Sequence, residues 1–156
     1  MAGANVTDSK FAERGSKAEI ETGTAFQPKF DADGLIAAVV TDFETGDVLM
    51  VGYMNAESLH RTIETGEACY WSRSRQEFWK KGETSGQIQH VKEIRTDCDQ
   101  DAIWLKVSVA GNGATCHVGF NSCFFRKIDK RDSGEICLER VEKEPVYDPK
   151  DVYGSK

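Results

Sequence analysis

Short apolar runs separated by polar turns fill the middle of the chain, from residue 30 to residue 127. Residues 35–41 form one apolar, β-branched run, and residues 48–53 form a second. The polar segment between them, Glu44-Thr45-Gly46-Asp47, contains the glycine that a hairpin turn favours. The pattern therefore predicts a β-hairpin over residues 35–53.

One segment in this region carries the signals of a helix. Asn55 stands at the N-cap position, Glu57 lies in the first turn, and Gly66 follows the last turn, so residues 56–64 are predicted to be helical. Strands are predicted over residues 68–72, 87–95, 101–109 and 122–127, of which 101–109 alternates most clearly. The sequence therefore predicts an α+β domain with a mostly antiparallel sheet and one or two helices.

The two ends of the chain differ from this patterned middle. Residues 1–28 combine glycines and balanced charges without an apolar run, which predicts a flexible N-terminal extension with one candidate helix over residues 10–21. Residues 129–156 are charged and contain two prolines, and we expect a C-terminal extension packed on the domain with one short strand near residue 138. Residues 29–128 are the predicted single domain.

Composition and charge narrow the functional classes. The net charge of −6 argues against binding to nucleic-acid polymers, which requires a basic surface. The longest apolar run, residues 35–40, is far shorter than the roughly 20 residues that span a membrane. No secretory signal is recognisable, so we expect a cytoplasmic protein with reduced thiols. In that compartment, metal binding or catalysis is a better explanation of the five cysteines than disulfides.

The densest chemical signal is Asp97-Cys98-Asp99-Gln100-Asp101. It is not an EF-hand loop, because Ala102 stands where glycine is required and Ser108 where glutamate is required. In an extended chain the three carboxylates would share one face, and the thiol of Cys98 would point to the other. Such a segment would offer oxygen ligands to Mg²⁺ and a sulfur ligand to Zn²⁺, whereas the simpler interpretation is a solvated acidic turn.

Two further cysteines lie seven positions apart, in Cys116-His117 and at Cys123, and do not form a CxxC pair. A lone cysteine is most often a small buried residue, which is our interpretation of Cys69 and Cys137. Cys98, Cys116 and Cys123 are instead predicted to bind a metal ion. Three protein ligands would leave a fourth position open for water, as in catalytic zinc sites, where the bound water ionises near neutral pH.

A basic stretch separates these cysteines from the predicted helix. Residues 72–95 contain six cations and three anions, a local charge of +3 within a chain of net charge −6. Arginine, hydroxyl groups and glycine-exposed amides are suited to a phosphate monoester, although a flexible charged loop would have the same composition. The candidate substrate-binding residues are Ser72, Arg73, Ser74, Arg75, Lys81, Glu83, Thr84 and Ser85.

Eight short motifs follow one another along the patterned part of the chain. They are, in order, Met54-Asn55, Tyr70-Trp71-Ser72-Arg73-Ser74-Arg75, Lys81-Gly82-Glu83-Thr84-Ser85-Gly86, Val91-Lys92-Glu93-Ile94, Asp97-Cys98-Asp99, Asp101-Ala102, Cys116-His117 and Ser122-Cys123-Phe124-Phe125-Arg126. Taken together, these motifs resemble the phosphoribosyl-AMP cyclohydrolase family of histidine biosynthesis. Two departures are Val118, where the family often has threonine, and Gln87, where it often has histidine or asparagine.

The resemblance implies an intertwined homodimer with two kinds of metal site. Zn²⁺ would be bound by Cys98 from one subunit and by Cys116 and Cys123 from its partner. Mg²⁺ would be bound by the aspartates, which are Asp97, Asp99 and Asp101. The implied reaction hydrolyses the N1–C6 bond of N1-(5-phosphoribosyl)-AMP to the formimino ribotide, by attack of zinc-bound hydroxide with Mg²⁺ assisting.

A proton must also move from the attacking water to the departing nitrogen. His117, beside Cys116, is the first candidate for this transfer and His90 in the basic stretch is the second, whereas His60 is expected to be structural. The two phosphate monoesters of such a substrate suit the basic stretch.

Two other functions stay open at this stage. A zinc nucleobase deaminase would also direct hydroxide to C6 of adenine, but its H-x-E signature is absent, because the residues two after each histidine are Thr62, Lys92 and Gly119. A structural zinc module that binds a phosphorylated partner would need a fourth protein ligand, such as His117, and no phosphate pocket.

Overall fold

The computed structural model describes residues 10–142, 144–148 and 150. It confirms the prediction of an α+β architecture with mostly antiparallel strands and two helices. None of the described helices is long and apolar enough to cross a membrane. The elements are α2 (Lys17–Thr22), β1 (Ile36–Asp42), β2 (Val48–Met54), α3 (Ala56–Thr65), β3 (Cys69–Ser72), β4 (Glu77–Lys80), β5 (Gln89–Thr96), β6 (Ala102–Val109), β7 (Arg126–Lys130) and β8 (Ile136–Arg140).

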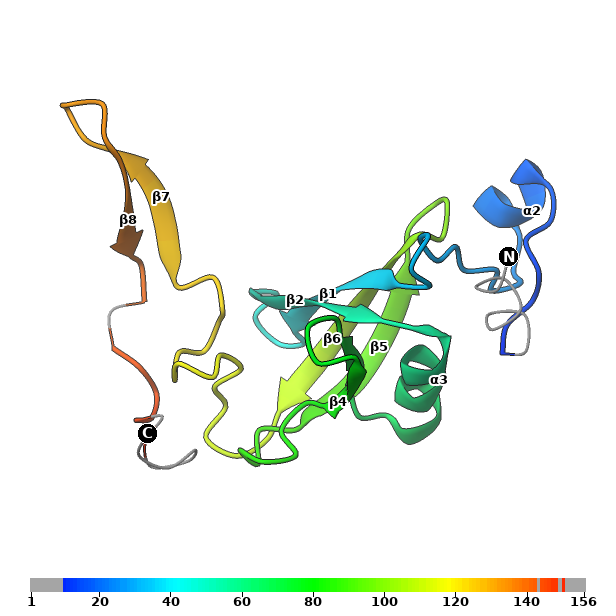
Figure 1. The fold of residues 1–156 in the computed structure, drawn as a ribbon. Coiled ribbons are helices and arrows are strands. Elements are labelled where there is room, and N and C mark those ends of the chain that lie inside the picture. Colours follow the sequence, from blue (N-terminus) through cyan, green and yellow to red (C-terminus); the bar gives the residue numbers. More distant parts are fainter. Residues whose placement is uncertain (1–9, 143, 149, 151–156) are drawn as a thin grey trace.

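A four-stranded sheet in the order β2-β1-β6-β5 forms the centre of the molecule (Figure 1). The predicted hairpin is confirmed, since β1 pairs antiparallel with β2. β5 and β6 form a second antiparallel pair, which is joined by the turn that contains the three aspartates. β1 and β6 pair in parallel, so the turn at the start of β6 and the turn between β1 and β2 lie at opposite ends of the sheet.

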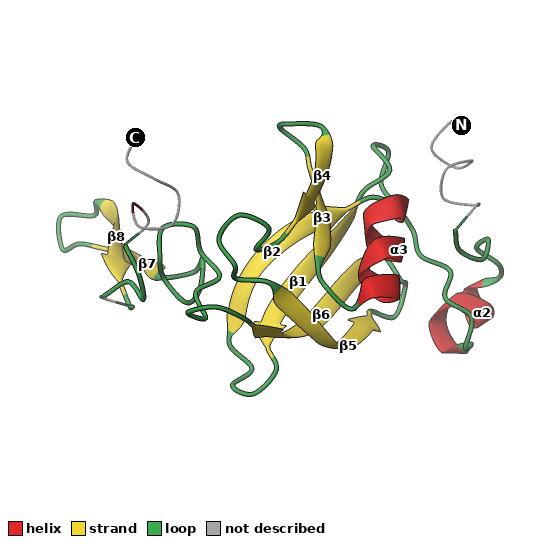
Figure 2. Cartoon of the chain, turned by 90° about the horizontal axis from the view of Figure 1, so that it is seen from below, coloured by secondary structure: helices red, strands yellow, loops and turns green. Residues whose placement is uncertain are grey.

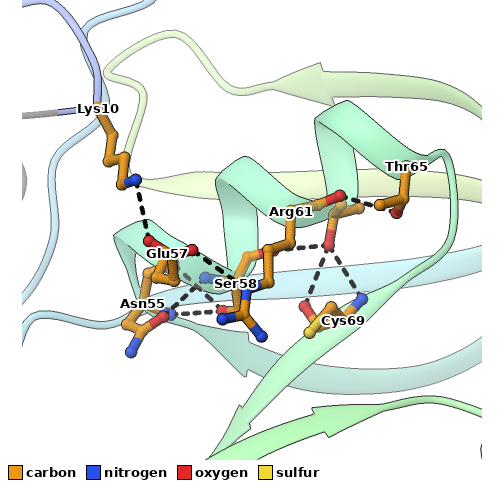
Figure 3. Close-up of polar contacts among 8 residues, drawn as sticks. Lys10, Asn55, Glu57, Ser58, Arg61, Thr65 and Cys69 are labelled. Carbon is orange, nitrogen blue, oxygen red and sulfur yellow. Dashed lines mark hydrogen bonds and ion pairs between the residues drawn. The ribbon is translucent and has the colours of Figure 1, made fainter.

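Helix α3 lies across one face of this sheet, and its ends are set by the residues that the sequence indicates (Figure 2). The Asn55 side chain accepts a hydrogen bond from the Ser58 N–H at 2.8 Å, and the Ser58 hydroxyl accepts one from the Asn55 N–H at 2.9 Å. This capping box satisfies two backbone donors that the first helical turn leaves free (Figure 3). Gly66 ends the helix in the left-handed conformation, with φ of 74°.

The core lies between the sheet, α3 and the short strand β3. Its fully buried side chains include Ile36, Leu59, Tyr70 and Leu105. Tyr70 donates a hydrogen bond to the Gln89 side chain at 2.6 Å, so its hydroxyl is satisfied inside the core. The ring of Tyr70 also explains Gly52 in β2, because a Cβ at that position would lie 2.8 Å from the ring. β3 is thereby fixed against β2.

One strand prediction is wrong, and one strand was not predicted. Residues 122–125 form a loop, and β7 begins only at Arg126, because the Ser122 hydroxyl donates to the Val48 carbonyl at 2.7 Å and Phe125 packs into a small cluster of its own. The strand that was not predicted is β4, which lies in the basic stretch and pairs with β3. Trp71 meets Phe78 across this pair, at 5.1 Å between ring centroids, and such aromatic contacts stabilise a short hairpin.

The described parts of the two extensions lie at opposite ends of the molecule (Figure 1). Residues 126–140 form the β7–β8 hairpin, which stands apart from the four-stranded sheet. At the other end, the ring of Phe11 contacts Phe26 and His60, with centroids 5.2 and 6.3 Å away, and Lys10 pairs with Glu57 at 3.0 Å. Residues 10–28 thus contact α3 and the core, and α2 covers only part of the candidate helix over residues 10–21.

Candidate functional site

A tight loop after β6 brings Cys116 and Cys123 together. The Cys116 N–H donates to the Phe120 carbonyl at 3.1 Å, and the Gly119 N–H donates back to the Cys116 carbonyl at 2.9 Å. Cys123 then returns to the sheet, where its N–H donates to the Leu49 carbonyl at 2.7 Å. Cys116 is buried, Cys123 is exposed on the isolated chain, and the two thiols interact directly.

The thiol pair could hold a soft metal cation. Protein atoms around Cys123 raise the pKa of its thiol to about 12, and the neighbouring Cys116 adds to the rise, whereas Lys81 opposes it. A dication would supply the positive charge that two adjacent thiolates require, and soft sulfur ligands suit Zn²⁺.

A cleft of about 700 Å³ opens in front of the thiol pair. Cys123 and His117 form one side of it, and the predicted basic stretch forms the other, through Arg75, Lys81 and the loop that follows. A second cleft of about 620 Å³ adjoins it, because Arg75 lines both. All eight candidate substrate-binding residues line one cleft or the other: Ser72, Arg73, Ser74 and Arg75 line the second, and Arg75, Lys81, Glu83, Thr84 and Ser85 line the first.

The loop after β4 has its shape because glycine stands at two positions. Gly82 has φ of +88°, and a Cβ there would lie 2.4 Å from the Gln87 backbone, so only glycine allows the chain to turn so closely. The Gly86 N–H closes the loop onto the Gly82 carbonyl at 2.8 Å. Glu83, Thr84 and Ser85 are thereby presented along the wall of the first cleft.

Lys81 lies deeper than a surface phosphate ligand would. Only 7% of its surface is exposed, and its Nζ donates to the Thr115 carbonyl at 2.5 Å. This bond joins the residue that follows β4 to the loop that carries Cys116. Lys81 thus positions the thiol pair in addition to contributing charge to the cleft.

The structure separates the three histidines. His117 lines the first cleft beside the thiols. His90 lies exposed in β5, bridged to Glu67, and does not line either cleft, because the alternation of β5 directs it to the opposite side from buried Gln89. His60 lies on α3 against Phe11. Of the two candidates for proton transfer, only His117 is beside the site.

The apolar residues that line the clefts were not predicted from the sequence. Met50, Val51, Trp79 and Phe124 line the first cleft, and Trp79 and Val51 also line the second. The signal that could have revealed Trp79 is the spacing of two aromatic pairs, residues 70–71 and 78–79, which face each other across β3 and β4. An aromatic side chain at this place provides a flat apolar surface on which a nucleotide base can stack.

The three aspartates converge, although not by the geometry that the sequence suggests. One carboxylate oxygen from each of Asp97, Asp99 and Asp101 can be chosen so that all lie within 4.8 Å of one another. Of the two interpretations of this segment, the structure has the turn and not the extended chain, since residues 97–100 form a turn in which Gln100 has φ of +57°. The turn is closed by Asp97, whose Oδ1 accepts the Asp101 N–H at 3.0 Å. Cys98 lies exposed on this acidic turn.

The carboxylates of the acidic turn shift one another's pKa. Hydrogen bonding to Asp99, and then to Asp97, raises the pKa of Asp101 to about 6, while hydrogen bonding to Asp101 holds the pKa of Asp99 below its ordinary value. Asp101 thus retains a proton more readily than an isolated carboxyl group does, because its neighbours are already negative. Three exposed carboxylates at this spacing could hold a hard dication such as Mg²⁺.

The acidic turn and the thiol pair lie at opposite ends of the sheet. Ala102 begins β6 directly after the turn that carries Cys98. The backbone N–H of Cys123 bonds to Leu49, near the start of β2. Because β2 pairs with β1 and β1 pairs with β6, this position lies level with Lys106 of β6. The two levels are four residues apart along β6, or about 13 Å. Cys98 therefore does not join the thiol pair within one chain. Among the described residues, the acidic turn is the only cluster of three or more histidine, cysteine, aspartate or glutamate side chains that could hold a metal ion.

Comparison with known proteins agrees with the resemblance. Residues 50–125 match the family model described as phosphoribosyl-AMP cyclohydrolase. Proteins with this name are 55% identical over 141 residues in Nitrobacter hamburgensis, covering 90% of this chain and 95% of the relative, and 59% identical over 138 residues in Rhizobium leguminosarum bv. trifolii, covering 88% and 91%. A relative of the same name from Rhodopseudomonas palustris is 57% identical over 136 residues, covering 87% and 91%.

These matches extend over the thiol loop, both clefts and the acidic turn. The chain therefore belongs to the phosphoribosyl-AMP cyclohydrolase family and is an enzyme.

Proposed function

We propose that this enzyme hydrolyses the N1–C6 bond of N1-(5-phosphoribosyl)-AMP in histidine biosynthesis, with zinc at the thiol pair and magnesium at the acidic turn. The observation that best supports the proposal is the composition of the first cleft. It combines the Cys123 thiol, which adjoins buried Cys116, and His117 with cationic and hydroxyl side chains within about 700 Å³. This volume is in the range of sites that enclose a small molecule.

The residues fit the two metal ions in different ways. Cys116 and Cys123 provide two soft ligands on one loop, and Cys98 of the partner subunit would provide the third. When bound, zinc supplies the Lewis acidity that allows water to act as a nucleophile near neutral pH. Asp97, Asp99 and Asp101 provide hard oxygen ligands for magnesium, which also bridges readily to a substrate phosphate.

A second copy of the chain would pack against the sheet face next to the clefts. Val39 of β1 alternates with the core residues Ala38 and Val40 and so belongs to the sheet face opposite α3. It pairs there with Val51, which is 45% exposed, and with half-buried Trp104. A two-fold arrangement across this face would bring the acidic-turn end of each subunit to the thiol end of the other and complete two identical sites.

The side chains of the clefts account for the steps of the reaction. Arg73 and Arg75 offer forked donors to one phosphate, and the hydroxyl groups of Thr84 and Ser85 donate to the other. Trp79 offers a face to the purine. In the hydrolysis, water adds its hydroxyl group to C6, the C6–N1 bond breaks, and N1 gains the proton. His117 is beside the thiol pair and can carry this proton from the water to N1.

We expect Arg75→Gln to raise KM more than it lowers kcat, because Arg75 lines both clefts and would lose its charged fork to phosphate. A loss of one charge-assisted contact corresponds to roughly tenfold in KM. Steady-state kinetics with Lys127→Gln as the charge-matched control, in the distant β7–β8 hairpin, gives the comparison. An unchanged KM in Arg75→Gln would contradict the phosphate-binding role.

The experiment that tests the metal assignment is metal analysis of the purified enzyme before and after washing with a chelator. The two sites should behave differently, because thiolate ligands hold zinc in a partly buried site, while exposed carboxylates exchange magnesium freely. We expect zinc to remain near one equivalent per chain and magnesium to be lost. Retention of magnesium with loss of zinc would reverse the assignment of the two sites.

A further inference from the structure

The N-terminal segment is connected to the acidic turn by a set of hydrogen bonds that the proposed chemistry does not use. At their centre is Gln100, which stands between Asp99 and Asp101 and is only 5% exposed. Its Oε1 accepts the Gln27 N–H at 2.7 Å, and its Nε2 donates to the Ile20 carbonyl at 2.9 Å. Both groups of this buried amide are therefore bonded to a segment more than 70 positions away in the sequence.

The backbone at Gln100 is held as well. The residue has φ of +57°, a left-handed conformation that side chains other than glycine, asparagine and aspartate rarely adopt. Its carbonyl accepts the Lys29 N–H at 2.7 Å. A residue stays in such a conformation only when its surroundings determine it, and here the N-terminal segment provides those surroundings.

Arg14 makes a second connection. Its Nη1 donates to the Asp99 carbonyl at 3.1 Å and to the Gln27 carbonyl at 2.8 Å. The Gly15 N–H donates to the Gln27 side chain at 2.9 Å, which closes the segment on itself. Asp99 and Gln100, two consecutive residues of the acidic turn, are thus both bound from the same side.

The segment is itself anchored to the body of the enzyme. Phe11 and Phe26 stack edge to face at 5.2 Å and pack, with Phe30, against the buried core. Lys10 is paired with Glu57 at the start of α3. The contacts to the acidic turn therefore extend from a fixed support, which a loosely attached tail would not provide.

We propose that residues 14–29 form a clamp that positions the acidic turn for a divalent cation, with Gln100 and Arg14 as its positioning residues. The inference rests on the proposed magnesium role of Asp97, Asp99 and Asp101. The clamp fixes the backbone at Asp99 and Gln100, so it limits the directions in which the carboxylates of Asp99 and Asp101 point. It holds Cys98 by the same means, because Cys98 lies in the same turn.

The test is calorimetric titration of Mg²⁺ into the metal-free enzyme, with the melting temperature of each variant measured in parallel. Gln100→Gly removes the side-chain bonds while allowing the left-handed backbone, and we expect it to bind Mg²⁺ about tenfold more weakly than the native enzyme. The matched control is Gln76→Gly, which makes the same change at φ of 54° in the β3–β4 turn and should leave Mg²⁺ affinity unchanged. Asp99→Asn gives the affinity expected when a ligand is lost.

A second variant keeps the sequence of the turn intact. Arg14→Gln should weaken Mg²⁺ binding in the same direction, whereas Lys17→Gln, an equal charge change on exposed α2, should not. If Gln100→Gly does not fold, Arg14→Gln decides the question. Native Mg²⁺ affinity in both Gln100→Gly and Arg14→Gln would contradict the proposed clamp and leave the magnesium role standing. Absence of Mg²⁺ binding by the native enzyme would instead overturn the magnesium role, and the clamp with it.

Discussion

Cys98→Ala and Cys116→Ala are each expected to be inactive, and a refolded mixture of the two is expected to recover activity. Each variant lacks one thiolate of the proposed zinc site, so neither variant alone would form a dimer with a complete ligand set. In a mixed dimer, one site combines intact Cys98 from one subunit with intact Cys116 and Cys123 from the other. Random pairing gives such dimers half of the population with one good site each, which predicts roughly a quarter of native activity.

The measurement is specific activity and zinc content of each variant and of the mixture, with the mixed dimer identified by mass. Cys137→Ala is the matched control, because Cys137 lies in β8 and lines neither cleft. This variant should keep native activity and native zinc. Mixed dimers that are present but inactive would contradict a site shared between subunits.

His117→Asn is expected to lower kcat by about 10² to 10⁴ and to change KM little, because the role proposed for His117 is to move a proton and not to bind phosphate. His60→Asn is the control, since His60 lies on α3 against Phe11. A native kcat in His117→Asn together with a large loss in His90→Asn would reverse the assignment of the two histidines.

Much of the fold could be predicted where local signals act alone. The limits of α3 follow from Asn55 and Gly66, whose capping roles depend only on neighbouring residues. The β1–β2 hairpin follows from two apolar runs around a glycine turn. β4 was missed because four residues are too few for a periodic pattern, and its pairing with β3 depends on aromatic contacts between Tyr70 and Trp79 and between Trp71 and Phe78.

The candidate site was predictable by residue type and much less by geometry. The basic stretch and the two cysteines of the thiol loop come together because each lies on a tight turn beside β2, and the turn residues were visible in the sequence. The shape of the acidic turn was not, because it depends on Gln100 at positive φ and on contacts from residues 14–29. Contacts between segments so far apart leave no periodic signal. The orientation of His90 likewise depended on which face of β5 is buried.

The most direct test of the central claim is the product formed when the zinc-loaded enzyme is incubated with N1-(5-phosphoribosyl)-AMP. Loss of the adenine chromophore is followed optically, product mass by mass spectrometry, and free ammonia by a coupled assay. We predict a product that has gained one water, in which the purine ring is open and no ammonia is released. Release of ammonia with an intact purine ring would identify deamination at the same carbon and would contradict the account.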